Sequence, residues 1–288
     1  YTDADGSVIN QVVEEPVKAG DNVYLTIDIA LQGAAERALA SGISQINQTR
    51  EDGDELADAG AVVALDVNTG DVLALASYPT FDLSTFGIDY SSLSTDESRP
   101  LYNRATQGTY NPGSTFKMVT ALTGLREGVI NGSTTVEDRG IYMEYADVGY
   151  TPRCWIYPSN HGVLDVVGAI ENSCNYFFYW VADQMDIDPI AETASEFGFG
   201  SSTGIEIGDG TGTLATREYK REVLGEGWYK ADTLITAIGQ GHNMFTPVQI
   251  ANYVATIANG GTVHKLTVLD KIVSSDYSTV LEEYDPEV

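Results

Sequence analysis

Two apolar runs around a short turn constrain the fold most strongly. The segment AVVALDVNTGDVLALASYP spans residues 61–79, and its turn is Asn68-Thr69-Gly70-Asp71. Glycine supplies the positive φ that a tight hairpin turn requires, and apolar runs of this length on either side are typical of strands. The segment therefore predicts a β-hairpin at the centre of an antiparallel sheet.

Helix signals precede and follow this hairpin. Asp28 is placed to cap a helix that begins at Ile29, and Thr246 is placed to cap a helix that has Pro247 in its first turn and Gly260 as its stop. The remaining predicted elements are strands at 23–27 and 262–273 and helices at 114–128, 163–186 (broken near 172–175) and 188–198. Strands near both ends with helices between them predict an α+β fold, in which helices cover a sheet.

The charge of the chain excludes one class of partner. The 288 residues carry 15 basic and 42 acidic side chains, which gives a net charge of −27. Such a surface repels nucleic acid phosphates and anionic membranes, so no nucleic acid partner is expected. No apolar run approaches the ~20 residues that cross a bilayer.

A lysine occurs among apolar residues in the segment NPGSTFKMVTALTGL, which spans residues 111–125. Desolvating an ammonium group is unfavourable unless the group is paired or its pKa is lowered. Ser114 lies three residues before Lys117, on the same face of a helix, and Pro112-Gly113 places this serine at the helix N-terminus. A neutral Lys117 could therefore accept the proton of a nucleophilic Ser114. The alternative interpretation is a capping serine and a lysine whose charged end reaches solvent.

A second short motif, Ser173-Cys174-Asn175, lies at the predicted break between two helices. An S-x-x-K motif followed by a Ser-x-Asn motif is part of the signature of penicillin-binding proteins and serine β-lactamases. Taken alone, the Ser-x-Asn pattern is equally compatible with a helix cap.

Four blocks of sequence together resemble the transpeptidase domain of class B penicillin-binding proteins. They are YNPGSTFKMVTAL, HGVLDVVGAIENSCNYFFY, FGFGSSTGIEI and AIGQGHNMFTPVQIANYVATIANGGTV, in the same order as in that family. The segment RCWIY ahead of the second block resembles the elongation-type members. The resemblance implies the penicillin-binding and serine β-lactamase-like fold, with an antiparallel sheet sandwiched by helices and an all-helical subdomain.

The resemblance also implies a reaction and its residues. Ser114 would be acylated by the D-Ala–D-Ala end of a peptidoglycan stem peptide, with Lys117 as its base. Ser173 would relay a proton to the leaving group, and Asn175 would hold the substrate amide and Lys117. An amine of a neighbouring stem would then take the acyl group, and β-lactams would trap the same serine. This chemistry needs no cofactor.

The resemblance further implies domain bounds, a location and partners. Residues 1–22 are expected to be a linker or the remnant of an upstream non-catalytic domain, and residues 23–288 the transpeptidase domain. The domain would act at the extracytoplasmic face of the bacterial membrane, anchored by a segment upstream of Tyr1, beside a glycosyltransferase. The family's K-T-G motif does not occur in the sequence. We therefore expect the chain to lack the C-terminal strands of the fold and to be poorly active alone.

Asp138, Cys154, His161 and Cys174 are a candidate metal-binding set. Two thiolates, an imidazole and a carboxylate suit tetrahedral zinc, although their spacing matches no standard zinc finger. A Cys154–Cys174 disulfide and a simple pair of buried thiols are the alternatives.

Other functions are alternatives to transpeptidation. Gly200-Ser201-Ser202-Thr203-Gly204 fits the G-x-S-x-G elbow of α/β-hydrolases, which must follow a strand and open a helix, yet strand-like residues come after it. His242 and His264 have no evident orienting acid for such a hydrolase. A serine β-lactamase or β-lactam sensor would use the same Ser114 and Lys117, and a non-catalytic cell-wall scaffold would need neither.

Overall fold

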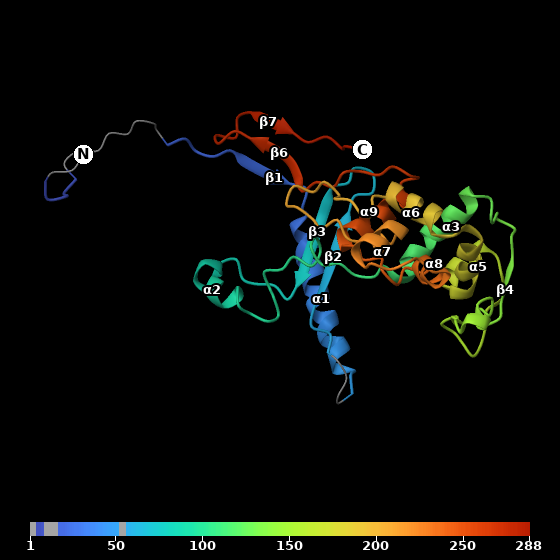
Figure 1. The fold of residues 1–288 in the computed structure, drawn as a ribbon. Coiled ribbons are helices and arrows are strands. Elements are labelled where there is room, and N and C mark those ends of the chain that lie inside the picture. Colours follow the sequence, from blue (N-terminus) through green and yellow to red (C-terminus); the bar gives the residue numbers. More distant parts are fainter. Residues whose placement is uncertain (1–3, 9–16, 52–55) are drawn as a thin grey trace. The chain divides into compact units, whose positions relative to one another are not determined.

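The computed structural model describes residues 4–8, 17–51 and 56–288, so the predicted linker is described only at 4–8 and 17–22. The described part contains these elements (Figure 1): β1 Asn22–Leu25, α1 Ile29–Gln48, β2 Gly60–Leu65, β3 Val72–Tyr78, α2 Phe86–Leu93, η1 Gly113–Phe116, α3 Lys117–Arg126, β4 Val136–Asp138, η2 Ala146–Val148, β5 Gly162–Leu164, α4 Val166–Glu171, α5 Asn175–Met185, α6 Ile187–Glu196, α7 Arg217–Val223, α8 Lys230–Ala237, α9 Pro247–Ala258, β6 Leu269–Val273 and β7 Val280–Glu283. None of the described helices combines the length and the apolar character needed to span a bilayer.

The chain divides into two compact units, and the smaller one is a three-stranded antiparallel sheet. It contains the described residues up to Leu25 together with Leu269–Asp285, in the strand order β1-β6-β7. Val23 lies opposite Ile272, and Lys271 lies opposite Glu283. The predicted strand at 262–273 is therefore β-structured only in its second half.

The larger unit contains the predicted hairpin, with β2 antiparallel to β3 and Val63 opposite Leu75. Helices α1 and α9 both pack against it. The hairpin was expected at the centre of a sheet, but in the described residues β2 and β3 form a two-stranded sheet of their own. One edge of β3 is occupied locally, because the Gln32 side chain of α1 donates to the Leu75 carbonyl oxygen at 3.0 Å and accepts from its N–H at 2.7 Å.

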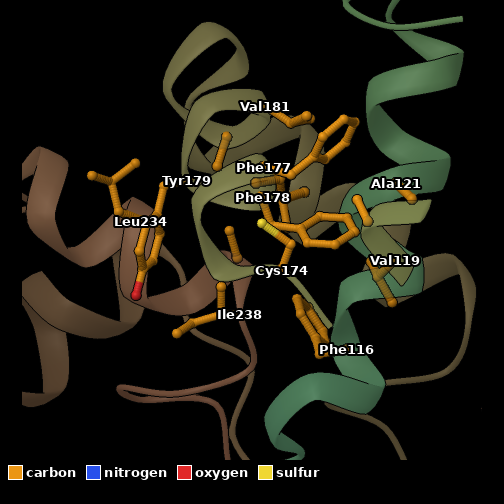
Figure 2. Close-up of a cluster of buried hydrophobic side chains, with 14 of the residues drawn as sticks. Phe116, Val119, Ala121, Cys174, Phe177, Phe178, Tyr179, Val181, Leu234 and Ile238 are labelled. Atoms are coloured by element: carbon orange, nitrogen blue, oxygen red, sulfur yellow. The ribbon is translucent and has the colours of Figure 1, made fainter. Parts of the chain in front are cut away.

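A buried helical cluster forms the core of the larger unit. Figure 2 shows side chains of α3, α5 and α8 packed against one another, with the Cys174 sulfur among them. Phe199 stacks on Phe245 with ring centroids 4.1 Å apart, and Phe116 at the start of α3 packs beside both. These residues tie the N-terminus of α3 to the rest of the core.

The helix boundaries that local capping sets are confirmed. The Asp28 carboxylate accepts from the N–H groups of Ala30 and Leu31, at 2.8 and 3.0 Å, at the start of α1. Thr246 and Gln249 form a reciprocal capping box at the start of α9. The predicted break within 163–186 separates α4 from α5. Three helices were not predicted: α2, α7 and α8.

Candidate active site

Ser114 lies on a 3₁₀ turn that leads directly into α3. The segment Gly113–Phe116 forms η1, and Gly113 has a φ of +57°, which a residue with a Cβ rarely adopts. Side chains three residues apart eclipse each other on a 3₁₀ turn, so Ser114 and Lys117 share a face. Ser114 is exposed, whereas only 2% of Lys117 is accessible.

The amine of Lys117 is held by the loop between α4 and α5. Its Nζ lies 2.7 Å from the Ser173 carbonyl oxygen, 3.0 Å from Ser173 Oγ and 2.6 Å from Asn175 Oδ1. The face of the Phe178 ring lies 5.8 Å from the same nitrogen. The structure thus brings together three of the four predicted catalytic residues through direct hydrogen bonds.

Ser114 itself is not hydrogen-bonded to Lys117 in the described residues, although the spacing predicted that the two side chains could meet. An ammonium has three N–H donors, and the three recorded acceptors account for all of them. A neutral amine would need only two of these acceptors, which leaves its lone pair for a hydroxyl group. Proton acceptance from Ser114 therefore depends on the neutral form of Lys117.

Burial makes that neutral form accessible. Desolvation penalises the charged ammonium and lowers the pKa of Lys117 to about 8, while the nearby Cys154 and Cys174 act in the opposite direction. A lysine at its ordinary pKa of about 10.4 would be neutral only rarely near pH 7.

The loop that supplies the acceptors has an unusual backbone. Ser173 has a φ of +49°, in the left-handed region that residues other than glycine rarely adopt. The Cys174 N–H bonds to the Ala169 carbonyl at 2.9 Å, and the indole N–H of Trp155 donates to the Asn172 carbonyl at 3.1 Å. Sequence reasoning missed Trp155 because its bond partner lies on a different segment.

A second loop supports the backbone next to Ser114. The Gly113 N–H donates to the Gly239 carbonyl at 2.8 Å, and Asn111 Nδ2 lies 3.1 Å from the Gly241 carbonyl and 2.6 Å from that of Asn243. The Tyr253 hydroxyl of α9 donates to the Thr115 carbonyl at 3.1 Å. The sequence did not single out these residues, because their importance lies in long-range backbone contacts.

The four residues predicted to bind a metal lie close together, and one of them, Cys174, directly follows Ser173. Their ligand atoms are all within 4.8 Å of one another. Cys154 Sγ lies 3.8 Å from Cys174 Sγ and 3.6 Å from His161 Nδ1, and Asp138 Oδ2 lies 2.7 Å from His161 Nδ1 and 3.5 Å from Cys174 Sγ. Both cysteines are buried and are free thiols in the structure.

The charges within this group are interdependent. The hydrogen bond between the two sulfurs lowers the pKa of Cys154 to about 6 and raises the pKa of Cys174, because the two sulfurs share one proton. Burial acts to raise the pKa of Asp138, but N–H groups of Gly140 and His161 outweigh it and lower that pKa. Cys154 and Asp138 are therefore favoured as anions, whereas Cys174 keeps the shared proton.

The alternative serine, Ser202, does not lie on a nucleophile elbow. No strand directly precedes it, and the next helix is α7, which begins at Arg217. Its hydroxyl donates to Asp209 Oδ1 at 2.6 Å rather than to a histidine. The geometry that an α/β-hydrolase requires is absent around Ser202 in the described structure.

Comparisons with known proteins show which proteins the chain resembles. Residues 60–287 match the family described as penicillin-binding protein transpeptidase domain. The chain is 39% identical to peptidoglycan D,D-transpeptidase MrdA of Escherichia coli over 265 residues, which cover 90% of this chain and 39% of that protein. It is 37% identical to MrdA of Haemophilus influenzae over 286 residues, covering 97% and 41% of the two chains. The chain thus spans about two fifths of the length of these relatives.

Solved structures show the same fold. A structure titled structural coordination of polymerization and crosslinking by a peptidoglycan synthase complex aligns with a TM-score of 0.83 and 36% identity, covering 100% of this chain and 50% of the other. Pseudomonas aeruginosa PBP2 in complex with WCK 5153 aligns with a TM-score of 0.78 and 34% identity, covering 93% and 57%. The predicted fold class is confirmed. The chain belongs to the transpeptidase domain family of penicillin-binding proteins, in its class B, elongation-type group.

Proposed function

We propose that the chain carries the catalytic centre of a peptidoglycan D,D-transpeptidase. Ser114 Oγ attacks the carbonyl carbon between two D-alanines of a stem peptide, and neutral Lys117 takes the hydroxyl proton. The C–N bond breaks, the leaving D-Ala amine gains a proton through Ser173, and an ester to Ser114 remains. An amine of a second stem then attacks this ester, releases Ser114 with its proton restored, and forms the cross-link.

The buried amine of Lys117 is the observation that carries this proposal. It is a group of lowered pKa, one 3₁₀ turn from an exposed serine, and its acceptors come from Ser173 and Asn175. In the neutral amine, two N–H groups donate to the Ser173 carbonyl and Asn175 Oδ1. The lone pair is then free for a hydroxyl, which is what a general base for serine requires.

The backbone N–H of Ser114 supports one further role. It lies at the start of the helical run, where unpaired N–H groups favour negative charge. We assign it as one donor to the oxyanion that forms on the attacked carbonyl.

Replacing Ser114 tests the nucleophile. Benzylpenicillin is expected to add its full mass to the unsubstituted chain, and Ser114→Ala should abolish that adduct because it removes the exposed hydroxyl one 3₁₀ turn from the buried Lys117 amine. Intact-mass spectrometry of the chain after incubation measures it. Ser202→Ala is the matched control, since that serine is also exposed, and it should keep the adduct.

The same assay separates the rival functions. An adduct that persists for hours supports a transpeptidase or a β-lactam sensor, whereas rapid release of hydrolysed penicillin supports a β-lactamase. If Ser114→Ala abolishes the adduct in vitro while the same substitution leaves cell growth and shape normal, the scaffold function is favoured instead.

Domain bounds, partners and location follow as parts of the proposal. Residues 23–288 are the transpeptidase part, and residues 1–22 are a linker to an upstream region. One solved relative belongs to a peptidoglycan synthase complex that coordinates polymerization and crosslinking, and PBP2 of Helicobacter pylori was solved in a complex with MreC. We infer that this chain works beside a glycosyltransferase at the extracytoplasmic face of the membrane, on stem peptides and as a β-lactam target.

We further propose that Asp138, Cys154, His161 and Cys174 hold a structural zinc ion. Tetrahedral zinc with Zn–S bonds of about 2.3 Å places two thiolates about 3.8 Å apart, and the two sulfurs are separated by 3.8 Å. In the described structure His161 Nε2 is buried with no hydrogen-bond partner, and Nδ1 is the nitrogen that faces Asp138 and Cys154. Such an ion would brace the Ser173 loop and supply no step of the reaction.

Metal analysis tests this site. The chain purified without chelator is expected to contain one zinc per molecule, and His161→Ala should lose it because one of four ligands is removed. His242→Ala lies outside the group and should retain the ion. Metal-free protein with two titratable thiols would exclude the proposal. Elemental analysis and thiol titration are the measurements.

A further inference from the structure

We propose that Cys154 and Cys174 form a reversible disulfide when the metal group is empty, and that this disulfide disables the site that holds Lys117. The inference rests on the proposed function, since it concerns regulation of the same catalytic centre. It assigns to the two thiols a second chemical state that excludes metal binding. The partner in this chemistry is an oxidant of the disulfide class, such as glutathione disulfide.

The two sulfurs are close enough to be joined by a small movement. They are 3.8 Å apart, and a disulfide bond is about 2.0 Å long. Both side chains are buried, with 2% of Cys154 and 0% of Cys174 accessible, so each is the nearest thiol available to the other. The chain contains only these two cysteines, which excludes any competing internal pairing.

The position of Cys174 connects this bond to catalysis. Its neighbours Ser173 and Asn175 are the two residues that hold the Lys117 amine, with bonds of 2.6 to 3.0 Å. Hydrogen bonds of this kind are lost when donor and acceptor separate beyond about 3.5 Å. Closing the sulfur gap by about 1.8 Å moves one or both sulfurs, by side-chain rotation or by displacement of their loops. A shift of Ser173 and Asn175 by about 1 Å away from Lys117 Nζ lengthens all three contacts past this limit and releases the amine.

Tight packing leaves Cys174 little room to absorb the movement by itself. Its sulfur lies in the core between α3 and α5, beside labelled neighbours that include Phe177 and Phe178 (Figure 2). Its N–H is bonded to the Ala169 carbonyl, and Cys174 is the N-cap residue directly before α5. Interiors packed to this density transmit strain instead of absorbing it. The displacement therefore passes to the neighbouring backbone of Ser173 and Asn175.

The exchange is balanced with a small disulfide as oxidant. The Cys154 thiolate attacks one sulfur of that disulfide, which releases one thiol and leaves a mixed disulfide on Cys154. The Cys174 thiolate then attacks Cys154 Sγ and releases the second thiol. The two cysteines are oxidised, the oxidant is reduced to two thiols, and the two cysteine protons end on those thiols.

Metal binding and this oxidation exclude each other. Two of the four ligands become a disulfide that no longer offers thiolates, so a zinc ion retains only Asp138 and His161. Conversely, a zinc ion bound to both thiolates would occupy the sulfur electron pairs that attack the oxidant, and it would keep the segment between the cysteines closed. Because both thiols are buried, thiol–disulfide exchange with the oxidant requires the segment between the two cysteines to open. The metal-free chain is therefore the form expected to react.

Thiol counting with and without zinc tests the exclusion. Metal-free chain treated with glutathione disulfide is expected to lose both thiols, lose two hydrogens in mass, and yield a peptide linking Cys154 to Cys174. Chain loaded with zinc should keep both thiols under the same treatment. Retention of two thiols in the metal-free chain, or equal oxidation of the two forms, would overturn the proposal.

Acylation and amide exchange test the effect on the site. In the oxidised chain we expect benzylpenicillin acylation to fall at least ten-fold relative to the reduced metal-free chain, with recovery after dithiothreitol. Amide exchange at residues 172–176 should accelerate. In Cys154→Ser neither quantity should respond to the oxidant. If oxidation changes neither the acylation rate nor the amide exchange rate, the link between the disulfide and the site that holds Lys117 is refuted. If no form is acylated at all, the proposed function fails, while thiol counts and exchange still decide this inference.

Discussion

Lys117→Met should lower the rate of Ser114 acylation by benzylpenicillin ~10³-fold, within the range that general-base catalysis contributes. Methionine fills a similar volume but has no lone pair that can accept the serine proton. It also leaves Ser173 and Asn175 without the amine that joins them. The measurement is the rate of adduct formation by intact-mass spectrometry, compared with the unsubstituted chain under identical conditions.

Two further variants make this result specific. Lys230→Met removes a partly exposed lysine that pairs with Asp183, and it should leave the acylation rate nearly unchanged. Lys117→Arg keeps a cation among the same acceptors but cannot become neutral near physiological pH, so it should be as slow as Lys117→Met. A Lys117→Met chain that is acylated at the original rate would show that another group activates Ser114.

Gly239→Ala should unfold the region around Ser114. A Cβ at this position would lie 2.0 Å from the Gly113 carbonyl oxygen and 2.8 Å from Phe116 Cβ, and Gly239 has a φ of +74°. Backbone atoms at this distance must move, which adds an overpacking penalty to the cost of the left-handed conformation. We expect the free energy of unfolding to fall by about 3 kcal/mol or more, together with loss of acylation.

Gly260→Ala separates the two contributions to that loss. Gly260 has a φ of +87°, but a Cβ there meets no atom within 4 Å. Gly260→Ala should therefore lower the free energy of unfolding by only about 1–2 kcal/mol, which is the cost expected for an alanine in the left-handed conformation. Acylation should be retained. Denaturant unfolding of the three chains measures the difference. Equal losses for the two variants would mean that the contact with Gly113 has no energetic importance.

Local signals in the sequence predicted the elements whose stabilisation is local. Asp28 and Thr246 cap their helices with hydrogen bonds to residues two or three positions away, so a short window of sequence contains both partners. The hairpin β2–β3 was predicted for the same reason. Its expected position at the centre of a sheet was wrong for the described residues, since one edge of β3 contacts the Gln32 side chain on a separate helix.

The candidate site was only partly accessible to sequence reasoning. The spacing of Ser114 and Lys117 places them on one face, but the acceptors of the Lys117 amine lie 56 and 58 residues further along the chain. The resemblance to a family, and not the spacing, pointed to them. The sequence assigned no role to Trp155, Asn111 or Gly239, since each acts through a backbone carbonyl that only the fold brings near.

The pH dependence of acylation tests the central claim most directly, which is that neutral Lys117 activates Ser114. Burial lowers the Lys117 pKa to about 8, so the neutral fraction should rise about ten-fold per pH unit below that value and level off above it. The acylation rate should follow this curve between about pH 6 and pH 10. A rate that is constant over this range, or that still rises ten-fold per unit up to the ordinary lysine pKa, would contradict the account.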